Sequence, residues 1–169
     1  MNKTLRNCGG VLVLLALLTT GCSFASDDDV TGGNLRGVNH TRQEVSRFSV
    51  NGYGGLVGGN TCCILLPDKW RPGMKVQVKW KSVDTKNIDF PGYGDEKKFQ
   101  EWQQKIAAHS VNKSAVADVP QYGAKRCGLT VHFLPCDKVK VTTSCWGYGS
   151  PEYPIKEPLN MPEPKTCPR

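Results

Sequence analysis

The sequence predicts a mainly β protein of the α+β class: a small antiparallel β-sandwich-like domain with one amphipathic helix, stabilised by disulfides. One strand is predicted by alternation of apolar and polar residues, with Val76, Val78 and Trp80 on one face. Two further alternating segments, 129–133 and 139–143, flank a Pro-Cys-Asp turn and predict a hairpin. Six cysteines between residues 62 and 167 complete the evidence for a disulfide-stabilised β fold.

Residues 1–21 are predicted to be a lipoprotein signal peptide. Lys3 and Arg6 precede the apolar run 11–18, which is too short to span a bilayer comfortably. Cys22 follows a small residue, as in the bacterial lipobox, where the leader is cut and the thiol acylated. The threonine three residues before it departs from the usual Leu, Val or Ile of that motif. The alternative is an ordinary signal peptide with an incidental cysteine.

The expected cofactor is only a covalent lipid on Cys22. Ser23 in place of aspartate favours the outer membrane by the usual sorting rule of such lipoproteins. We therefore expect a lipid-anchored protein on the periplasmic side of a bacterial membrane. The expected membrane is the outer membrane.

The remaining 148 residues (169 less 21) suit one domain with a real core. The expected organisation is a polar tether over 22–35, one β-rich domain over 36–149 and an extended proline-rich tail over 150–169, pinned by a cysteine. Loss of the two leader cations lowers the formal net charge from +7 to +5. The sequence has no arginine-rich run with interleaved aromatic residues, which is the pattern that would indicate a nucleic-acid partner.

Cysteine counting is informative. Of eight cysteines, Cys8 leaves with the leader and Cys22 is expected to carry lipid. An even six in an exported chain predicts three disulfides. A zinc site is the alternative to disulfides for these cysteines, but the sequence has no Cys-x-x-Cys motif and no histidine pair at ligand spacing. No metal site is therefore predicted. The six are Cys62, Cys63, Cys127, Cys136, Cys145 and Cys167.

One disulfide follows from the register of the predicted hairpin. If the hairpin is centred on Cys136, Val131 faces Val141 and the apolar faces of both strands agree. The same register places Cys127 opposite Cys145, within reach of a cross-strand disulfide.

The pairing of the other four cysteines stays open. Cys62 and Cys63 would point to opposite faces of a strand, so they are not expected to bond each other. Cys136 and Cys167 are the partners available to them.

Three other segments are predicted to fill in the sheets and loops. Residues 47–53 alternate as a strand and lead into a flexible glycine-rich loop over 54–59. Residues 116–119 predict a short strand that Pro120 stops.

A single amphipathic helix is predicted from the N-cap Asp95 to about His109. Phe99, Trp102 and Ile106 recur at helical spacing and are expected to be its buried stripe.

No catalytic residue can be named, and we expect no enzyme. His40, His109 and His132 lack recognisable catalytic partners: His109 and His132 are interpreted as structural or solvent-facing, and His40 as capping a turn. Gly-x-Ser-x-Gly is absent, and the glycines of 52–59 do not precede a helix or a Lys-Ser/Thr pair.

Several short motifs together resemble a bacterial lipoprotein family catalogued as domain of unknown function 3304. They are Asn39-His40-Thr41, FSVNGYGG over 48–55, Cys62-Cys63, KWRPG over 69–73, VKW over 78–80 and HFLPC over 132–136. The resemblance covers about residues 36–156. Members are often encoded beside lipase effectors of the type VI secretion system, which implies an immunity role.

The resemblance therefore implies a periplasmic immunity protein that binds and inhibits a cognate phospholipase effector stoichiometrically. Loops 52–60 and 84–93 are the expected contact regions, with Tyr53, Phe90 and Tyr93 as candidate partner-binding residues. Ordinary packing is the alternative for these aromatics. The alternative function is a structural or envelope-homeostasis lipoprotein without a toxin partner. An enzyme or small-ligand binder would need a pocket that the sequence does not show.

Overall fold

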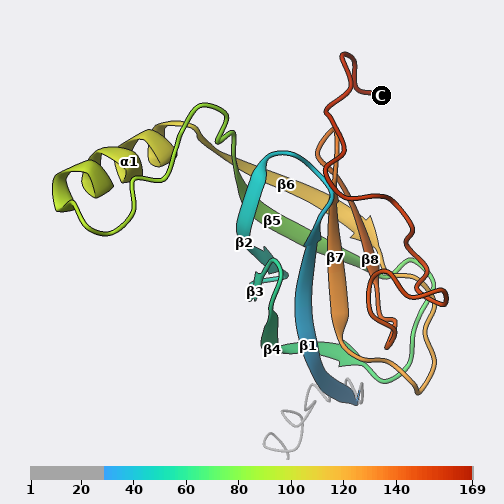
Figure 1. Ribbon diagram of the computed structural model, residues 1–169. Helices are drawn as coiled ribbons and strands as arrows, with labels where there is room; N and C mark the ends of the chain where they lie inside the picture. Colours follow the sequence, from blue (N-terminus) through green and yellow to red (C-terminus); the bar gives the residue numbers. More distant parts are fainter. Residues whose placement is uncertain (1–28, 169) are drawn as a thin grey trace, which may run out of the picture.

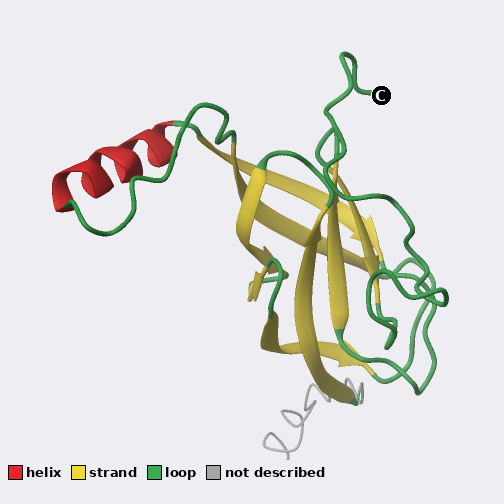
Figure 2. Ribbon diagram, in the orientation of Figure 1, coloured by secondary structure: helices red, strands yellow, loops and turns green. Residues whose placement is uncertain are grey.

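Two four-stranded sheets pack face to face in the computed structural model, which describes residues 29–168 (Figure 1). The first sheet has the order β4-β1-β7-β8 and consists of β1 (Val30–Asn39), β4 (Asn60–Pro67), β7 (Leu129–Leu134) and β8 (Lys138–Thr142). The second has the order β3-β2-β5-β6 and consists of β2 (Glu44–Val50), β3 (Tyr53–Leu56), β5 (Lys75–Val83) and β6 (Ser110–Asp118). The predicted mainly β class is confirmed, and Figure 2 shows the one helix beside the strands.

The predicted leader and Cys22 lie outside the described residues. Part of the predicted tether over 22–35 belongs to the fold, because β1 begins at Val30 and Leu35 is fully buried. The tether prediction is therefore too long at its C-terminal end. The start of β1 was not predicted because the strand follows charged aspartates and because its inward-facing residues are few and lie among glycines.

The β7–β8 hairpin has the predicted register. Val131 pairs with Val141 and Phe133 with Val139. All neighbouring strands pair antiparallel except β1 and β7, which are parallel. Strands of a parallel pair are usually covered on both faces. Every residue of β7 is indeed buried.

Aromatic rings from both sheets meet in the centre of the core. The Phe133 ring of β7 lies 5.3 Å from Phe48 of β2 and 5.4 Å from Trp80 of β5, measured between centroids. A Cβ atom on Gly55 would lie 2.4 Å from the Phe48 ring, so only glycine leaves room for that ring. The predicted inward face of β5 is confirmed, since Val76, Val78 and Trp80 are all buried.

The segment predicted as one strand over 47–53 is instead a strand and a turn. β2 ends at Val50, and Asn51-Gly52 form a two-residue hairpin turn with positive φ angles of 49° and 93°. This is the geometry for which Asn-Gly is strongly preferred. The chain returns as β3, so the glycine-rich segment 54–59 contains a short strand and is not wholly a loop.

The helix α1 (Glu96–Ala108) has the predicted limits. The Asp95 side chain accepts a hydrogen bond from the backbone N–H of Lys98 at 3.1 Å, and His109 forms the C-cap. Its predicted packing is wrong, because α1 stands away from both sheets beyond the ends of β5 and β6 (Figure 1) and none of its residues is buried. No helix among residues 29–168 is long and apolar enough to cross a membrane.

Two disulfides fix the first sheet and the tail. Cys127 and Cys145 are joined with their Cα atoms 4.9 Å apart, the pair that the hairpin register predicts. Cys136 is joined to Cys167, so the expectation that these two would serve as partners for the Cys62-Cys63 pair is wrong.

Cys62 and Cys63 are bonded to each other, which corrects the prediction of separate partners. Gly33 pairs with Ile64 and Asn34 pairs with Cys62, so Cys63 is the extra residue of a β-bulge. Strict alternation of side chains stops at such a bulge. The peptide bond between the two cysteines is cis, and their Cα atoms are 3.0 Å apart.

Removal of the Phe133 ring should lower the free energy of unfolding more than any surface substitution. We expect Phe133→Ala to lower the free energy of unfolding by about 3–5 kcal/mol, because it leaves a cavity between the sheets. Val116→Ala, on the exposed face of β6, is the matched control and should cost less than about 0.5 kcal/mol. Urea denaturation of the oxidised protein measures both, and equal losses would contradict the assigned core.

Candidate functional site

The C-terminal tail (150–168) covers the outer face of the first sheet. Cys167 pins the tail through its disulfide to Cys136, but the middle of the tail is buried and does not simply run along the surface. Tyr153 and Ile155 are both buried. The backbone N–H of Met161 donates to the carbonyl of His40 at 2.7 Å, which joins the tail to the end of β1.

Beneath the tail, two histidines and a tyrosine form one buried hydrogen-bonded chain. The Tyr153 hydroxyl lies 2.6 Å from Nε2 of His132, and Nδ1 of His132 lies 2.7 Å from Nε2 of His40. Nδ1 of His40 lies 3.0 Å from the carbonyl oxygen of Pro158. Both histidines are completely buried.

The direction of this chain follows from its two ends. The Pro158 carbonyl can only accept, so His40 must carry its proton on Nδ1 and accept at Nε2. His132 then donates from Nδ1 and accepts the Tyr153 hydroxyl proton at Nε2. Each ring nitrogen is satisfied while both rings are neutral. An extra proton on His132 would turn the Tyr153 hydroxyl from donor to acceptor and would place a charge in a buried site.

The pair is therefore suited to holding the tail and not to proton transfer with a substrate. Burial, followed by the effect of neighbouring His40, lowers the pKa of His132 from 6.5 to about 3. The interpretation of His132 as structural fits the structure, whereas the solvent-facing alternative is wrong for it, because the tail covers both His132 and His40.

The sequence pattern placed His132 on the outer face of its strand but did not predict that it meets His40. The parallel pairing of β1 with β7 brings Val38 opposite His132, with His40 two residues further on. The only signal in the sequence was the pair of large apolar residues Tyr153 and Ile155 within the proline-rich tail.

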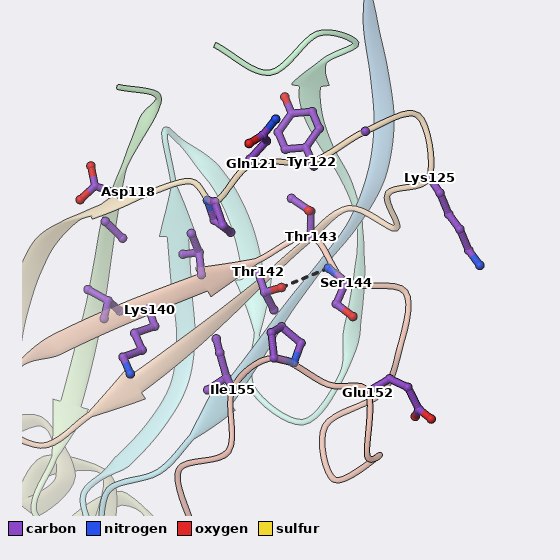
Figure 3. A pocket seen from close by; sticks show the side chains of 16 residues that line it. Asp118, Gln121, Tyr122, Lys125, Lys140, Thr142, Thr143, Ser144, Glu152 and Ile155 are labelled. Atoms are coloured by element: carbon purple, nitrogen blue, oxygen red, sulfur yellow. Dashed lines mark hydrogen bonds between the residues drawn. The ribbon is translucent and has the colours of Figure 1, made fainter. Parts of the chain in front are cut away.

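A large cleft lies where the edges of the two sheets face each other. It has a volume of about 790 Å³ and is lined by β6, the loop after it, β8 and the tail (Figure 3). Lys140 in its wall is paired with Glu157 of the tail, and the Thr142 hydroxyl accepts from the N–H of Ser144 at 3.2 Å. No histidine or cysteine lines this cleft.

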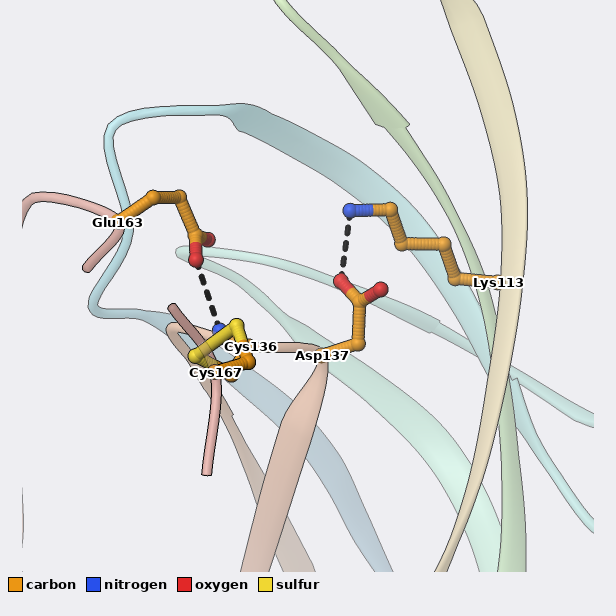
Figure 4. Close-up of a disulfide and its surroundings, with 5 residues drawn as sticks. All are labelled: Lys113, Cys136, Asp137, Glu163 and Cys167. Atoms are coloured by element: carbon orange, nitrogen blue, oxygen red, sulfur yellow. Dashed lines mark hydrogen bonds and ion pairs between the residues drawn. A yellow bond between two sulfur atoms is a disulfide. The ribbon is translucent and has the colours of Figure 1, made fainter. Parts of the chain in front are cut away.

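Cys136, Cys167 and Glu163 bring potential metal ligands together at the hairpin turn (Figure 4). The two sulfurs form a disulfide and therefore lack the thiolate charge that a metal requires. A Glu163 oxygen accepts a hydrogen bond from the N–H of Cys136 at 2.8 Å. Beside it, the ammonium group of Lys113 on β6 lies 2.6 Å from Asp137, which ties the two sheets together. The arrangement is a structural fastening.

The helical arm (84–109) carries two of the three predicted partner-binding residues. Phe90 and Tyr93 lie in the loop before α1, and their ring centroids are 5.0 Å apart. The helix residues Phe99 and Trp102 stack against them, with centroids 5.5 Å from Tyr93 and 5.1 Å from Phe90 respectively. The apolar stripe of α1 is thus only half-covered, by its own loop. Tyr93 remains 82% exposed and Phe90 49% exposed.

Tyr53 lies apart from this cluster. It pairs with Val50 at one end of β2, whereas the arm leaves the sheet beside the other end, where Glu44 pairs with Val83. Six residues of strand separate the two ends, roughly 20 Å at about 3.3 Å per residue. The structure therefore does not bring Tyr53, which is 37% exposed, together with Phe90 and Tyr93.

Comparison with known proteins identifies the family of the chain. The model of a family described as protein of unknown function (DUF3304) matches residues 38–141. The chain belongs to this family. The DUF3304 match extends from the end of β1 into β8, so it includes the helical arm and stops before the tail. No curated protein and no solved structure matches the chain.

The buried histidine chain predicts a loss of stability in acid. In the unfolded chain His132 should take up a proton near pH 6.5, whereas in the folded protein it does so only near pH 3. The unfolded state binds more protons between these values, so this contribution is fully present above pH 6.5 and declines as the pH falls toward 3. The free energy of unfolding should fall by up to about 1.4 kcal/mol per pH unit.

Urea denaturation across this pH range measures the slope. His132→Phe should flatten it, because the titrating group is gone. His109→Gln, which changes the exposed histidine at the end of α1, is the control and should leave the slope as in the wild type. An unchanged slope in His132→Phe would contradict the assigned role.

Proposed function

We propose that this protein is a lipid-anchored immunity protein that binds and inhibits a type VI secreted phospholipase in the periplasm. Membership of the DUF3304 family supports the proposal, because the family resemblance described above implies an immunity role against such lipases. The observation that carries it is the helical arm (84–109), which projects from a cross-linked scaffold and exposes an aromatic pair (Figure 1).

The arm has the composition and the position of a binding element. Phe90 and Tyr93 combine large apolar area with exposure, and Tyr93 adds a hydroxyl group. Aromatic residues of this kind dominate the free energy of many protein interfaces. The core residues all belong to the sheets and the segments that cover them, so the arm is not needed to fill the core. Its exposed rings are therefore available to a partner.

The scaffold suits stoichiometric inhibition because it is stiff. Disulfides join Cys127 to Cys145 and Cys136 to Cys167, and the buried histidines hold the tail. A binding element on a rigid base loses little conformational entropy on binding, which favours affinity. In this proposal the arm covers or enters the active-site cleft of the lipase and excludes its lipid substrate.

The lipid anchor has a physical role in the same proposal. A phospholipase must reach a membrane to act, and an inhibitor acylated at Cys22 is concentrated at that surface. Confinement raises the effective concentration of the inhibitor without any new contact. The anchor contributes to protection in the cell, whereas the arm carries inhibition itself.

Inhibition should be stoichiometric in a purified system. Titration of the phospholipase encoded beside this gene with the full chain should lower its activity linearly to near zero at one inhibitor per enzyme. The assay should use a micellar substrate so that the membrane anchor is not required. A neighbouring lipase that stays fully active and does not co-purify would contradict the proposal and favour an envelope-homeostasis lipoprotein instead.

The aromatic pair should carry much of the binding free energy. We expect Tyr93→Ala to weaken lipase binding by about 2 kcal/mol, or roughly 30-fold, because it removes an exposed ring and hydroxyl from the contact. Calorimetry measures the affinity, and the melting temperature should stay unchanged because the side chain is 82% exposed.

Two variants control this measurement. Val116→Ala removes an exposed apolar side chain from the outer face of β6 and should leave the affinity unchanged. Tyr53→Ala tests the other predicted loop, at the opposite end of β2. Loss of affinity in Tyr53→Ala together with normal affinity in Tyr93→Ala would overturn the role of the arm.

A further inference from the structure

A second, smaller cleft lies beside the buried histidine chain and contains an arginine. The Arg36 cleft, with a volume of about 230 Å³, has Arg36, Asn60 and Thr130 on the sheet and Trp146 and Tyr148 in the loop that leads to the tail. Arg36 projects from the outer face of β1, where it pairs with Asn60 of β4 on one side and with Thr130 of β7 on the other. The cleft is separate from the helical arm and from the cleft between β6 and β8.

The charge of Arg36 is uncompensated within residues 29–168. No aspartate or glutamate lines the cleft, and Arg36 forms no ion pair in the part of the chain that the structure describes. Its Nε atom is shielded from solvent and has no hydrogen-bond partner. The Nε atom of Arg126 likewise has no hydrogen-bond partner, but the guanidinium of Arg126 is paired with Asp68. A shielded guanidinium donor without an acceptor is costly unless a ligand or water supplies one.

The walls of the cleft are held in place by the fold. Cys145 fixes the start of the loop through its disulfide to Cys127, and the next residue is Trp146. The Tyr148 hydroxyl donates to the carbonyl of Glu157 at 2.5 Å, so its proton is already used. The polar side chains that line the cleft include the guanidinium of Arg36, the amide of Asn60 and the hydroxyl of Thr130. A site that is already shaped needs little reordering to bind.

We infer that the Arg36 cleft binds one compact oxyanion, a phosphate or carboxylate group. A guanidinium matches two oxygens of such a group with two parallel N–H bonds, and the Asn60 amide can add a third donor. The volume equals that of roughly eight water molecules at about 30 Å³ each, which suits a headgroup or a small acid but not a larger ligand. Trp146 forms the exposed rim and reports on occupancy.

The experiment is a titration of the full chain, purified in a nonionic detergent, at constant ionic strength. The probes are inorganic phosphate, acetate and glycerol phosphate, with chloride as the reference anion, and the signals are tryptophan fluorescence and calorimetry. We expect a saturable one-site response in both signals for the wild type. In Trp146→Phe the fluorescence response should be absent, whereas the calorimetric response should persist. Tighter binding of glycerol phosphate than of inorganic phosphate would identify a lipid headgroup as the source of the anion, and equal binding would identify a free anion.

Three arginine variants decide the assignment. Arg36→Gln should weaken binding at least tenfold, and Arg36→Lys, which keeps the charge without the fork, should weaken it by a smaller factor. Arg47→Gln removes an exposed arginine from the outer face of the other sheet and should leave affinity unchanged. Equal weakening by Arg36→Gln and Arg47→Gln, or no response beyond that of chloride in the wild type, would overturn the inference. Circular dichroism verifies that each variant is folded. If Arg36→Gln does not fold, the comparison of Arg36→Lys with the wild type still tests the assignment.

Discussion

The hydrogen-bonded chain from Tyr153 through His132 and His40 to Pro158 is the interaction on which the rest of the structure depends. It joins β7, β1 and the tail at one buried point, and the parallel β1–β7 pair needs such a cover on its outer face. Because every ring nitrogen is satisfied in the neutral state, the tail can seal polar side chains without leaving an unpaired group. The same seal positions Tyr148 and so shapes the wall of the Arg36 cleft.

The architecture separates what holds the protein together from what is free to bind. The two sheets, the disulfides and the tail bury the aromatic centre around Phe133. In the helical arm (84–109), by contrast, no residue of α1 is buried. An amphipathic helix with a half-covered apolar stripe is unusual unless its exposed side meets a partner. This contrast is why the proposed inhibitory surface lies on the arm, and why changes there should leave folding intact.

Local patterns in the sequence predicted much of the fold, and tertiary contacts account for most of what was missed. Alternation fixed the β7–β8 register, and with it the pairing of Cys127 with Cys145, because a hairpin leaves little freedom in pairing. Helical spacing located α1 but not its surroundings: periodicity shows that Phe99 belongs to an apolar stripe, not what covers the stripe. The meeting of His132 with Tyr153 depends on a parallel pairing and a tail without regular structure, neither of which has a local signature.

The most direct measurement of the central claim, that the arm is the inhibitory surface, is amide hydrogen exchange of the full chain with and without the neighbouring phospholipase. Our account predicts that protection on binding is concentrated in the arm, in the loop carrying Phe90 and Tyr93 and in α1, with little change in the sheets. Sheet amides are already slow to exchange because they are hydrogen-bonded and buried. Protection confined to the β2–β3 hairpin or the tail, or no protection at a saturating lipase concentration, would contradict it.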